Sequence, residues 1–554
     1  MPPGIEACEK VSGKRRINIE GSPSTGLGAS KFQVSSSKLK AGEDEVKPVL
    51  LFNMGITKRI GYYIEEAQKT LSEGKDVILL LPEIGHENKI IESFKEKFMD
   101  LVAVIHSNMS EKEKYEEWSK IYSGKAKIAI GTRSAVFAPV KAHGLIIIDE
   151  ESEFTYKSEQ TPKYHVREVA LFMSKREGSR IILSSSNPSI ESFYRAKNGD
   201  YEIKEKPQVK NEIQTEVSVV DVKEERSRQL SLKLKEEIRN ALEAKEPVML
   251  IQNRRGYAPF LVCNSCGNPI ECPNCSLSLA YHSPDSSIRC HRCGFVSEQK
   301  ILCPKCLSHS INYFGAGTQK IESEIGKLFS GIKTIRIDKD NINSKKGAGI
   351  ALEAFVEDEA QILIGTQMVL KALPKKKFGL VAVISADASL NCPDFRAAES
   401  TFDFIYQITN GTGDFIAPRK AIIQTLNPQH YAITCAAEGD YNKFYETEIR
   451  SRQDFGYPPF SSLINIVLSG KDKDVVHKKA VEFCRGLKAG HKDVEILGPV
   501  RAPIEKLKGR TRYQMLIKGR DLDMIKIELK SAIRKFAKDK EVRISVDVDP
   551  ANLV

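Results

Sequence analysis

Short apolar runs alternate with helix-length segments through most of this chain of 554 residues. In the first half these runs are Val77–Leu81, Val102–Ile105, Ile128–Ile130, Leu145–Ile148 and Ile181–Leu183. Nearly continuous apolar strands that are separated by helices are typical of a parallel sheet covered on both faces. The pattern therefore predicts one α/β domain over residues 46–205.

A second set of apolar runs predicts a second α/β domain over residues 206–262 and 311–432. Its members are Pro247–Ile251, Ile335–Ile337, Ile362–Ile364, Leu380–Ile384 and Ala421–Ile423. A cysteine-rich segment interrupts this set just after its first run. An autonomous module is expected at such a place, because loops tolerate insertions.

The two ends of the chain differ from these domains. Residues 1–45 are rich in Gly, Ser and Lys and nearly free of aromatic residues, which predicts a disordered segment. Extended stretches at 464–468 and 542–546 predict a separate C-terminal α+β domain over residues 433–554.

Eight of the 12 cysteines form four C-x-x-C pairs inside the interrupting segment, which we delimit as residues 263–310. The pairs are Cys263 and Cys266, Cys272 and Cys275, Cys290 and Cys293, and Cys303 and Cys306. Each pair places two thiolates on one tight turn, and four thiolates bind one tetrahedral zinc ion. The segment therefore predicts two zinc ions, and because every ligand is a thiolate, both sites are structural.

The spacing favours a nested pairing of these cysteines. The inner pairs are separated by 14 residues, which is close to a zinc-ribbon pattern, and the outer pairs would then share the other ion. A sequential arrangement and an interleaved cross-brace are alternatives that the spacing leaves open.

Composition narrows the class of protein. No apolar run approaches the roughly 20 residues that span a bilayer, and the N-terminus lacks a signal peptide, so we expect a cytoplasmic protein without a membrane partner. The formal charge of +11 is a modest basic excess that is compatible with a phosphate-bearing partner.

Several motifs stand in a fixed order around the cysteine segment. They are Gly131–Pro139, Asp149–Glu151, Asn253–Phe260, Gly365–Met368, Asn391–Glu399, Tyr457–Phe460, Leu497–Pro499 and Asp547–Pro550. Together they closely resemble the primosomal protein N′ family, the PriA-type replication-restart DNA helicases of bacteria, from Val49 to Val554. The resemblance implies two tandem RecA-like helicase lobes, the nested zinc pairing, and the loading of a replicative helicase at DNA forks through primosome proteins.

The same resemblance assigns roles in the first lobe. Asp149 and Glu150 stand where such motors hold Mg²⁺ and a water-activating carboxylate. The segment that follows matches the loop with which the family senses single-stranded DNA. Stacking faces and phosphate contacts are implied for its aromatic and basic side chains, namely Phe154, Tyr156, Lys157, Lys163, Tyr164 and Arg167.

The sequence departs from the family at both ends of the expected ATP site. Where the family has a Gly-rich phosphate loop, this chain has Asn53 to Ile60, with Arg59 in place of the lysine and Ile60 in place of the Mg²⁺-binding hydroxyl. Gly411 and Asp414 replace arginines that stabilise charge on the γ-phosphate, and such a loss typically lowers the rate 10³–10⁵-fold.

We therefore expect a degenerate replication-restart protein that binds forked or single-stranded DNA and primosome partners without efficient ATP hydrolysis. In this interpretation Asp149 and Glu150 are relics, ATP and Mg²⁺ are not used, and the family's N-terminal DNA-binding domain has no counterpart in residues 1–45. The alternatives are an active ATP-dependent 3′→5′ DNA helicase and a zinc-ribbon nucleic-acid binder unrelated to restart.

Overall fold

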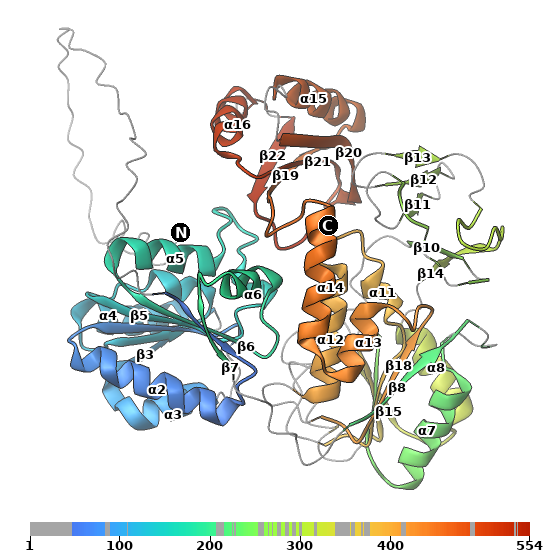
Figure 1. Ribbon diagram of the computed structural model, residues 1–554, viewed down its shortest axis with the longest axis horizontal. Helices are drawn as coiled ribbons and strands as arrows, with labels where there is room; N and C mark the ends of the chain where they lie inside the picture. Colours follow the sequence, from blue (N-terminus) through green and yellow to red (C-terminus); the bar gives the residue numbers. More distant parts are fainter. Residues whose placement is uncertain are drawn as a thin grey trace. The chain divides into compact units, whose positions relative to one another are not determined.

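The computed structural model describes most of the chain between residues 47 and 553 (Figure 1). The stretches outside the described residues are 1–46, 84–88, 108, 206–214, 224, 226–228, 253–259, 264, 267, 269, 274–278, 283–286, 291–294, 298–301, 315–317, 338–354, 356–359, 367–368, 370–376, 412–416, 488–493, 537–538, 540 and 554. The predicted disordered segment 1–45 lies outside the described residues. Within the described part, no helix combines the length and apolar character that a membrane span requires.

The first of two compact units ends at Pro207 and contains a parallel sheet, as the apolar runs predicted. Its strand order is β3-β4-β2-β5-β6-β1-β7. The strands are β1 (Val49–Phe52), β2 (Asp76–Leu80), β3 (Val102–Ile105), β4 (Ile128–Gly131), β5 (His143–Ile148), β6 (Arg180–Ser185) and β7 (Glu202–Glu205). The helices are α2 (Ile56–Ser72), α3 (Lys89–Phe98), α4 (Glu111–Ser123), α5 (Val166–Glu177) and α6 (Ile190–Lys197).

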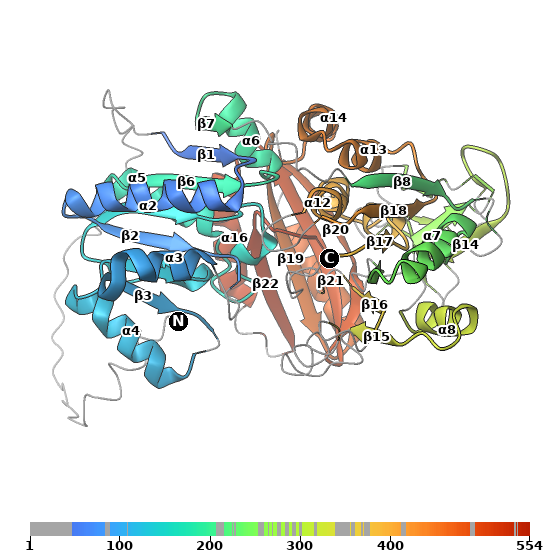
Figure 2. The same ribbon diagram turned by 90° about the horizontal axis from the view of Figure 1, so that it is seen from below.

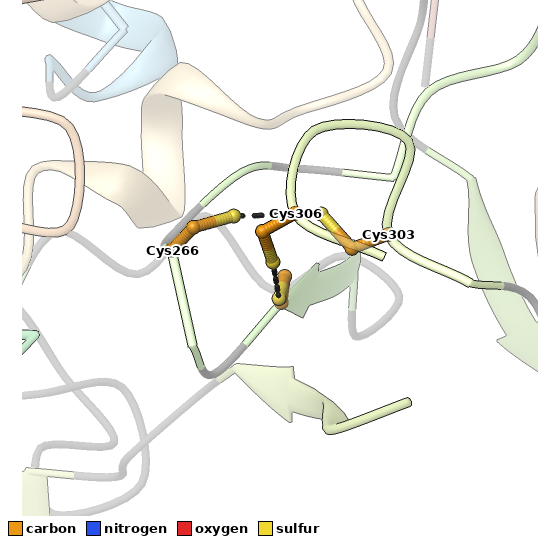
Figure 3. A group of neighbouring side chains, drawn as sticks. Cys266, Cys303 and Cys306 are labelled. Carbon is orange, nitrogen blue, oxygen red and sulfur yellow. Dashed lines mark hydrogen bonds between the residues drawn. The ribbon is translucent and has the colours of Figure 1, made fainter. Parts of the chain in front are cut away.

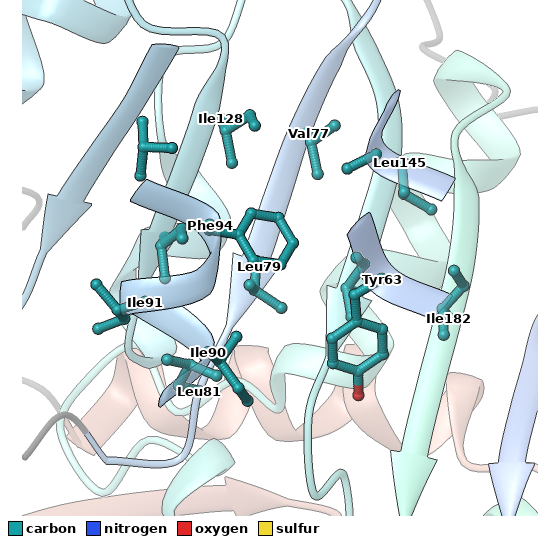
Figure 4. Close-up of a cluster of buried hydrophobic side chains, with 14 of the residues drawn as sticks. Tyr63, Val77, Leu79, Leu81, Ile90, Ile91, Phe94, Ile128, Leu145 and Ile182 are labelled. Atoms are coloured by element: carbon teal, nitrogen blue, oxygen red, sulfur yellow. The ribbon is translucent and has the colours of Figure 1, made fainter. Parts of the chain in front are cut away.

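Helices cover both faces of this sheet. Helices α2 and α3 lie on one face, and α5 and α6 lie on the other (Figure 1). Tyr63 of α2 and Phe94 of α3 are fully buried against Leu79 of β2 and its neighbours (Figure 4). Burial of each such aromatic side chain contributes about 1.5–3 kcal/mol, and the apolar layer fixes where α2 lies over the strand ends.

The second unit begins at Gln208 and repeats the architecture of the first. Its parallel sheet has the order β15-β16-β9-β17-β18-β8. The strands are β8 (Glu216–Asp221), β9 (Val248–Ile251), β15 (Thr334–Ile337), β16 (Ile362–Gly365), β17 (Leu380–Val383) and β18 (Lys420–Thr425). The helices are α7 (Leu232–Glu243), α8 (Thr318–Leu328), α11 (Asp387–Leu390), α12 (Ala397–Asn410), α13 (Tyr431–Glu438) and α14 (Tyr441–Asp454).

The two Gly-Thr motifs occupy equivalent places in the two sheets. Gly131 ends β4 and Gly365 ends β16, each beside the sheet's edge strand. A Cβ on Gly131 would lie 2.4 Å from the carbonyl oxygen of Ile105, and one on Gly365 would lie 2.3 Å from Cγ2 of Val369. Both positions therefore require glycine because the following turn folds back closely on the sheet.

The cysteine-rich segment forms its own antiparallel sheet, of order β13-β12-β11-β10-β14, between β9 and α8. The strands are β10 (Phe260–Cys263), β11 (Ala280–His282), β12 (Ser287–Arg289), β13 (Val296–Ser297) and β14 (Ile311–Phe314). Strand β14 pairs with β10, so the module extends past residue 310, which we had predicted as its end. The module comes directly after β9. Because the edge strand β8 precedes β9 in the chain, β9 is the second strand of the lobe and not its first.

The C-terminal domain is a β-α-β-β-α-β unit with an antiparallel sheet of order β20-β21-β19-β22 (Figure 2). Its elements are β19 (Ser462–Gly470), α15 (Lys473–Gly486), β20 (Val494–Leu507), β21 (Arg510–Gly519), α16 (Asp523–Phe536) and β22 (Val542–Val548). Both predicted extended stretches lie in strands, in β19 and β22. The predicted boundary at residue 433 falls inside α13, and Phe444 of α14 stacks on Phe402 of α12 at 4.1 Å, so both helices pack with the second lobe.

The motifs at 391–399 and 457–460 join this domain to the second lobe. Phe395 stacks on Tyr457 with ring centroids 4.9 Å apart, and Asp394 accepts a 2.7 Å hydrogen bond from the backbone of Leu553. Buried Arg452 pairs with Glu399 at 2.6 Å and with Glu448 at 2.8 Å. The Phe395–Tyr457 and Asp394–Leu553 contacts therefore hold the two domains together, whereas the Arg452–Glu399 pair joins α14 to α12 within the second lobe.

The helix cap at His430 gives a test of stability against pH. Its Nδ1 accepts a 3.2 Å hydrogen bond from the backbone N–H of Ala432, and burial lowers the pKa of His430 to about 4. The unfolded value is about 6.5, so the cap stabilises fully above that pH and its contribution is lost as the pH falls toward 4.

We expect His430→Asn, which keeps a capping side chain but does not titrate, to reduce the loss of stability between pH 6.5 and pH 4 by about 2 kcal/mol. Hydrogen exchange of α13 in variant and wild type measures the difference, and other titrating groups cancel in the comparison. Parallel pH profiles of the two proteins would contradict this role of His430.

Candidate functional site

The connection between β1 and α2 is shorter than a phosphate loop. Strand β1 ends at Phe52 and α2 already begins at Ile56, three residues before Arg59. The backbone N–H of Arg59 donates to the carbonyl of Gly55 at 3.0 Å, as in any helix. The predicted loop from Asn53 to Ile60 is therefore half helix, and its Arg59 side chain projects from the first turns of α2.

The guanidinium of Arg59 contacts both carboxylates of the acidic motif. Its Nε lies 3.0 Å from Oδ1 of Asp149, and an η nitrogen lies 2.6 Å from Oε1 of Glu150. The Arg59 side chain is 4% exposed and that of Asp149 is 7% exposed. A cationic side chain is thus buried against the carboxylates that stand where related motors hold Mg²⁺.

Tyr63, one turn after Arg59 on α2, completes the cluster. Its hydroxyl donates to Oδ1 of Asp149 at 2.8 Å and also contacts the Ser184 hydroxyl, which donates to the same carboxylate oxygen at 3.1 Å. Glu150 accepts from the Ser185 hydroxyl and from the Ser186 backbone, each at 3.3 Å. Sequence reasoning missed Tyr63, although a residue four positions after Arg59 shares its helix face.

The pKa shifts follow from burial and charge. Burial disfavours the charged guanidinium of Arg59 and by itself would lower its pKa. The carboxylates of Asp149 and Glu150 outweigh that effect, so the pKa of Arg59 is raised above the ordinary value. Burial also raises the pKa of Asp149, against the opposing pull of Arg59. Burial and the neighbouring Asp149 raise the pKa of Tyr63, so its phenol stays protonated as a donor.

These residues do not fit a bound Mg²⁺ with its nucleotide. A cation site needs carboxylates whose charge is available, whereas Arg59 already balances Asp149 and Glu150. Ile60 offers no oxygen to the metal, and its neighbour Arg59 fills the space in front of the acidic pair. We derive no catalytic step through a metal or nucleotide at this place.

The third carboxylate of the acidic motif has a structural role. Glu151 is 1% exposed and accepts a 2.8 Å hydrogen bond from Arg167 and another from the Ser189 backbone. Hydroxyls of Ser189 and Ser192 donate to the same carboxylate. Since Ser189 caps α6 and Arg167 lies at the start of α5, Glu151 ties both helices to the end of β5.

The predicted DNA-contact residues divide into two groups. Arg167 (9% exposed), Lys157 (5%) and Tyr156 (1%) lie inside the first lobe. Tyr156 donates to the carbonyls of Leu80 and Asp149 at 3.0 and 2.6 Å. Each of these three side chains is packed or bonded internally, and a DNA contact for them stays a prediction.

The other group faces outward. Phe154 is 49% exposed, and Lys163 and Tyr164 are half-buried. The ring of Tyr164 meets that of Phe137 edge to face at 5.0 Å. Arg133, from the Gly131–Pro139 motif, donates to the carbonyls of Thr155 and Lys157 at 2.8 Å each. Arg133 thereby fixes the segment that carries Phe154, a role that the sequence did not reveal.

The outer cysteines of the module meet in one cluster. The sulfurs of Cys263, Cys266, Cys303 and Cys306 all lie within 4.8 Å of one another. The sulfurs of Cys266 and Cys303 lie 3.4 Å apart, and those of Cys263 and Cys306 lie 3.5 Å apart. Figure 3 shows Cys266 on one loop and Cys303 and Cys306 together on another. Tetrahedral zinc with 2.3 Å bonds needs sulfurs about 3.8 Å apart, so this donor set fits a zinc ion.

The two loops that supply these sulfurs have the same backbone geometry. The N–H of Cys263 donates to the carbonyl of Asn268, and that of Cys303 donates to Ser308. Each bond spans five residues, and the hydroxyls of Ser265 and Ser308 link the loops at 2.7 Å. The pairing of the outer four cysteines therefore agrees with the nested arrangement.

The inner cysteines are described only in part. Cys275 and Cys293 lie outside the described residues, whereas Cys272 and Cys290 are buried in the module's small core. The N–H of Cys290 donates to the carbonyl of Phe295 at 2.8 Å, again across five residues. This shared loop geometry favours a second metal site, which stays a prediction.

Comparisons with known proteins agree with these features. A family model described as the PriA DNA helicase Cys-rich region (CRR) domain matches residues 272–297, and one described as the primosomal protein N C-terminal domain matches residues 453–551. Replication restart protein PriA of Bacillus subtilis (strain 168) is 37% identical over 516 residues, or 92% of this chain and 64% of that protein. The chain thus spans less than two thirds of the length of that relative.

The chain is also similar to a second relative and to a solved structure. Replication restart protein PriA of Treponema pallidum (strain Nichols) is 33% identical over 499 residues, which are 89% of this chain and 75% of that protein. The structure of RecG bound to a three-way DNA junction is 14% identical with a TM-score of 0.40, covering 74% of this chain and 44% of that chain.

The cysteine geometry predicts how much metal the protein carries. We expect two zinc ions per chain, and Cys303→Ser should lower the content to one, because a four-thiolate site rarely keeps its ion after losing a ligand. Metal analysis after dialysis measures this, and Cys392→Ser, outside the module, serves as the matched control. One ion in the wild type, or the loss of both in the variant, would contradict two independent sites.

Proposed function

This chain belongs to the replication restart protein PriA family, and we propose that it binds forked or single-stranded DNA and primosome proteins without efficient ATP hydrolysis. In this role it would act in the cytoplasm and help to reload the replicative helicase. The family membership supports the part in restart. The proposal for ATP rests on one observation, the burial of Arg59 against Asp149 and Glu150.

The residues around that ion pair oppose catalysis in three ways. A phosphoryl-transfer site needs a lysine and backbone amides on the phosphates, a hydroxyl on Mg²⁺ and a carboxylate free to orient water. Arg59 replaces the lysine, Ile60 replaces the hydroxyl, and the carboxylate charge is balanced internally. Gly411 follows α12 with a positive φ of 70°, and Asp414 lies outside the described residues.

The surface around Phe154 supports DNA binding. Phe154 and Tyr164 offer aromatic faces on a segment that Arg133 anchors, and Lys163 adds a positive charge. Aromatic faces with nearby cations are the usual means of holding single strands. Buried Tyr156, Lys157 and Arg167 would support this surface from within.

The absence of ATP turnover can be tested directly. With forked DNA present, single-turnover hydrolysis by the wild type should not exceed background, and Glu150→Gln should not change it, because Glu150 has no nucleotide to act on. A DNA-stimulated rate that Glu150→Gln abolishes would instead support an active helicase.

The proposed DNA surface gives a second test. Phe154→Ala should weaken binding to single-stranded DNA about tenfold, since stacking contributes roughly 1–3 kcal/mol per base. Phe172→Ala, on the exposed part of α5, is the matched control and should leave affinity unchanged. Fluorescence anisotropy at one fixed salt concentration measures the affinity of both variants.

The same measurement on the wild type compares forked DNA with plain duplex. Equal affinities for the two would argue against fork preference.

A further inference from the structure

The ion pair of Arg59 connects helix α2 to the segment that carries Phe154. Asp149, which pairs with Arg59, also accepts from Tyr63 through its side chain and from Tyr156 through its carbonyl. The Thr155 and Lys157 carbonyls are in turn held by Arg133. A continuous set of polar contacts therefore runs from Arg59 through residues 149–158.

We propose that Arg59 is a built-in replacement for the divalent cation of this lobe. Its guanidinium neutralises Asp149 and Glu150 and holds residues 149–158 in one conformation with or without nucleotide. This inference deepens the proposed absence of ATP turnover and rests on it, but its test reads the conformation of the segment and not hydrolysis.

The chemistry of the side chain suits this role. Arginine spreads its charge over a planar guanidinium, so Arg59 donates to Glu150 at 2.6 Å while its Nε stays in ion-pair contact with Asp149 at 3.0 Å, as two carboxylates of a metal site would share one cation. Glu150 has a positive φ of 48°, a backbone conformation that non-glycine residues adopt only when their surroundings hold them. Contacts from Arg59, Ser185 and Ser186 to its carboxylate provide that restraint.

The decisive experiment compares two arginine variants of the whole chain. Arg59→Met keeps the apolar stem and removes the guanidinium. Arg180→Met is the matched control, because Arg180 forms a partly buried ion pair with Glu66 in the same lobe but lies away from the acidic motif. Hydrogen exchange of peptides covering residues 149–158 gives the conformational readout, and Mn²⁺ binding is followed by electron paramagnetic resonance.

We expect exchange of residues 149–158 to be at least tenfold faster in Arg59→Met than in Arg180→Met. Millimolar Mn²⁺ should slow it again in Arg59→Met, because the freed carboxylates can take up a cation, and Glu150→Gln in the same background should abolish that effect. The wild type should neither bind Mn²⁺ at this place nor respond to ATP with Mg²⁺.

Equal exchange in the two variants, or Mn²⁺ binding by the wild type that Glu150→Gln removes, would overturn the inference. If Arg59→Met does not fold, Arg59→Lys keeps a single charge without the fork and should show faster exchange than the wild type. Exchange in Arg59→Lys that matches the wild type would also overturn it. ATP turnover by the wild type would refute the proposed function, whereas these exchange results test Arg59 itself.

Discussion

Arg59 carries a positive charge into a part of the first lobe that water barely reaches, and this charge constrains the structure around it. A buried guanidinium is stable only among opposite charges and hydrogen-bond acceptors, and removal of one partner of such a pair typically costs about 3–5 kcal/mol. Asp149 and Glu150 must therefore stay within reach of Arg59. Helix α2 in turn has to begin at Ile56, so that Arg59 and Tyr63 lie one turn apart over the end of β5. The short β1–α2 connection and the neutralised charge of the acidic motif both follow from the buried charge of Arg59.

In the second lobe, the acidic residue near the equivalent strand end has different neighbours. Asp387 lies four residues after the end of β17 and begins α11, whereas Asp149 directly follows β5. Asp387 accepts hydrogen bonds from the Thr425 hydroxyl and the Leu426 backbone. Burial raises the pKa of Asp387 to about 6, whereas at Asp149 the charge of Arg59 opposes the rise. The repeated architecture supplies a buried acid at each sheet's carboxyl edge, and the neighbours of that acid decide what it can do.

The sequence predicted those parts of the fold that apolar runs or cysteine spacing determine. Central strands such as β2 and β5 are buried on both faces, so their composition identifies them. The edge strands β7 and β8 were missed, because sequences such as Glu202-Ile-Lys-Glu carry charges that an exposed edge tolerates. The burial of Tyr156 and Arg167 was also missed, since a charged segment looks like surface until its partners Leu80 and Glu151 are known.

The cysteine module and the first lobe depend on their surroundings in opposite ways. Among the described residues, the buried members of the module's core cluster are Leu261, Ile270, Cys272, Leu279, Ile288 and Cys290, so two of these six are themselves thiols. Such a core cannot bury enough apolar area to fold unaided, and metal binding has to supply the difference. In the first lobe the acidic pair obtains its cation from Arg59, a residue of the chain itself. Zinc supply would therefore control the state of the module, whereas the nucleotide supply would leave the first lobe, and the surface around Phe154, unchanged.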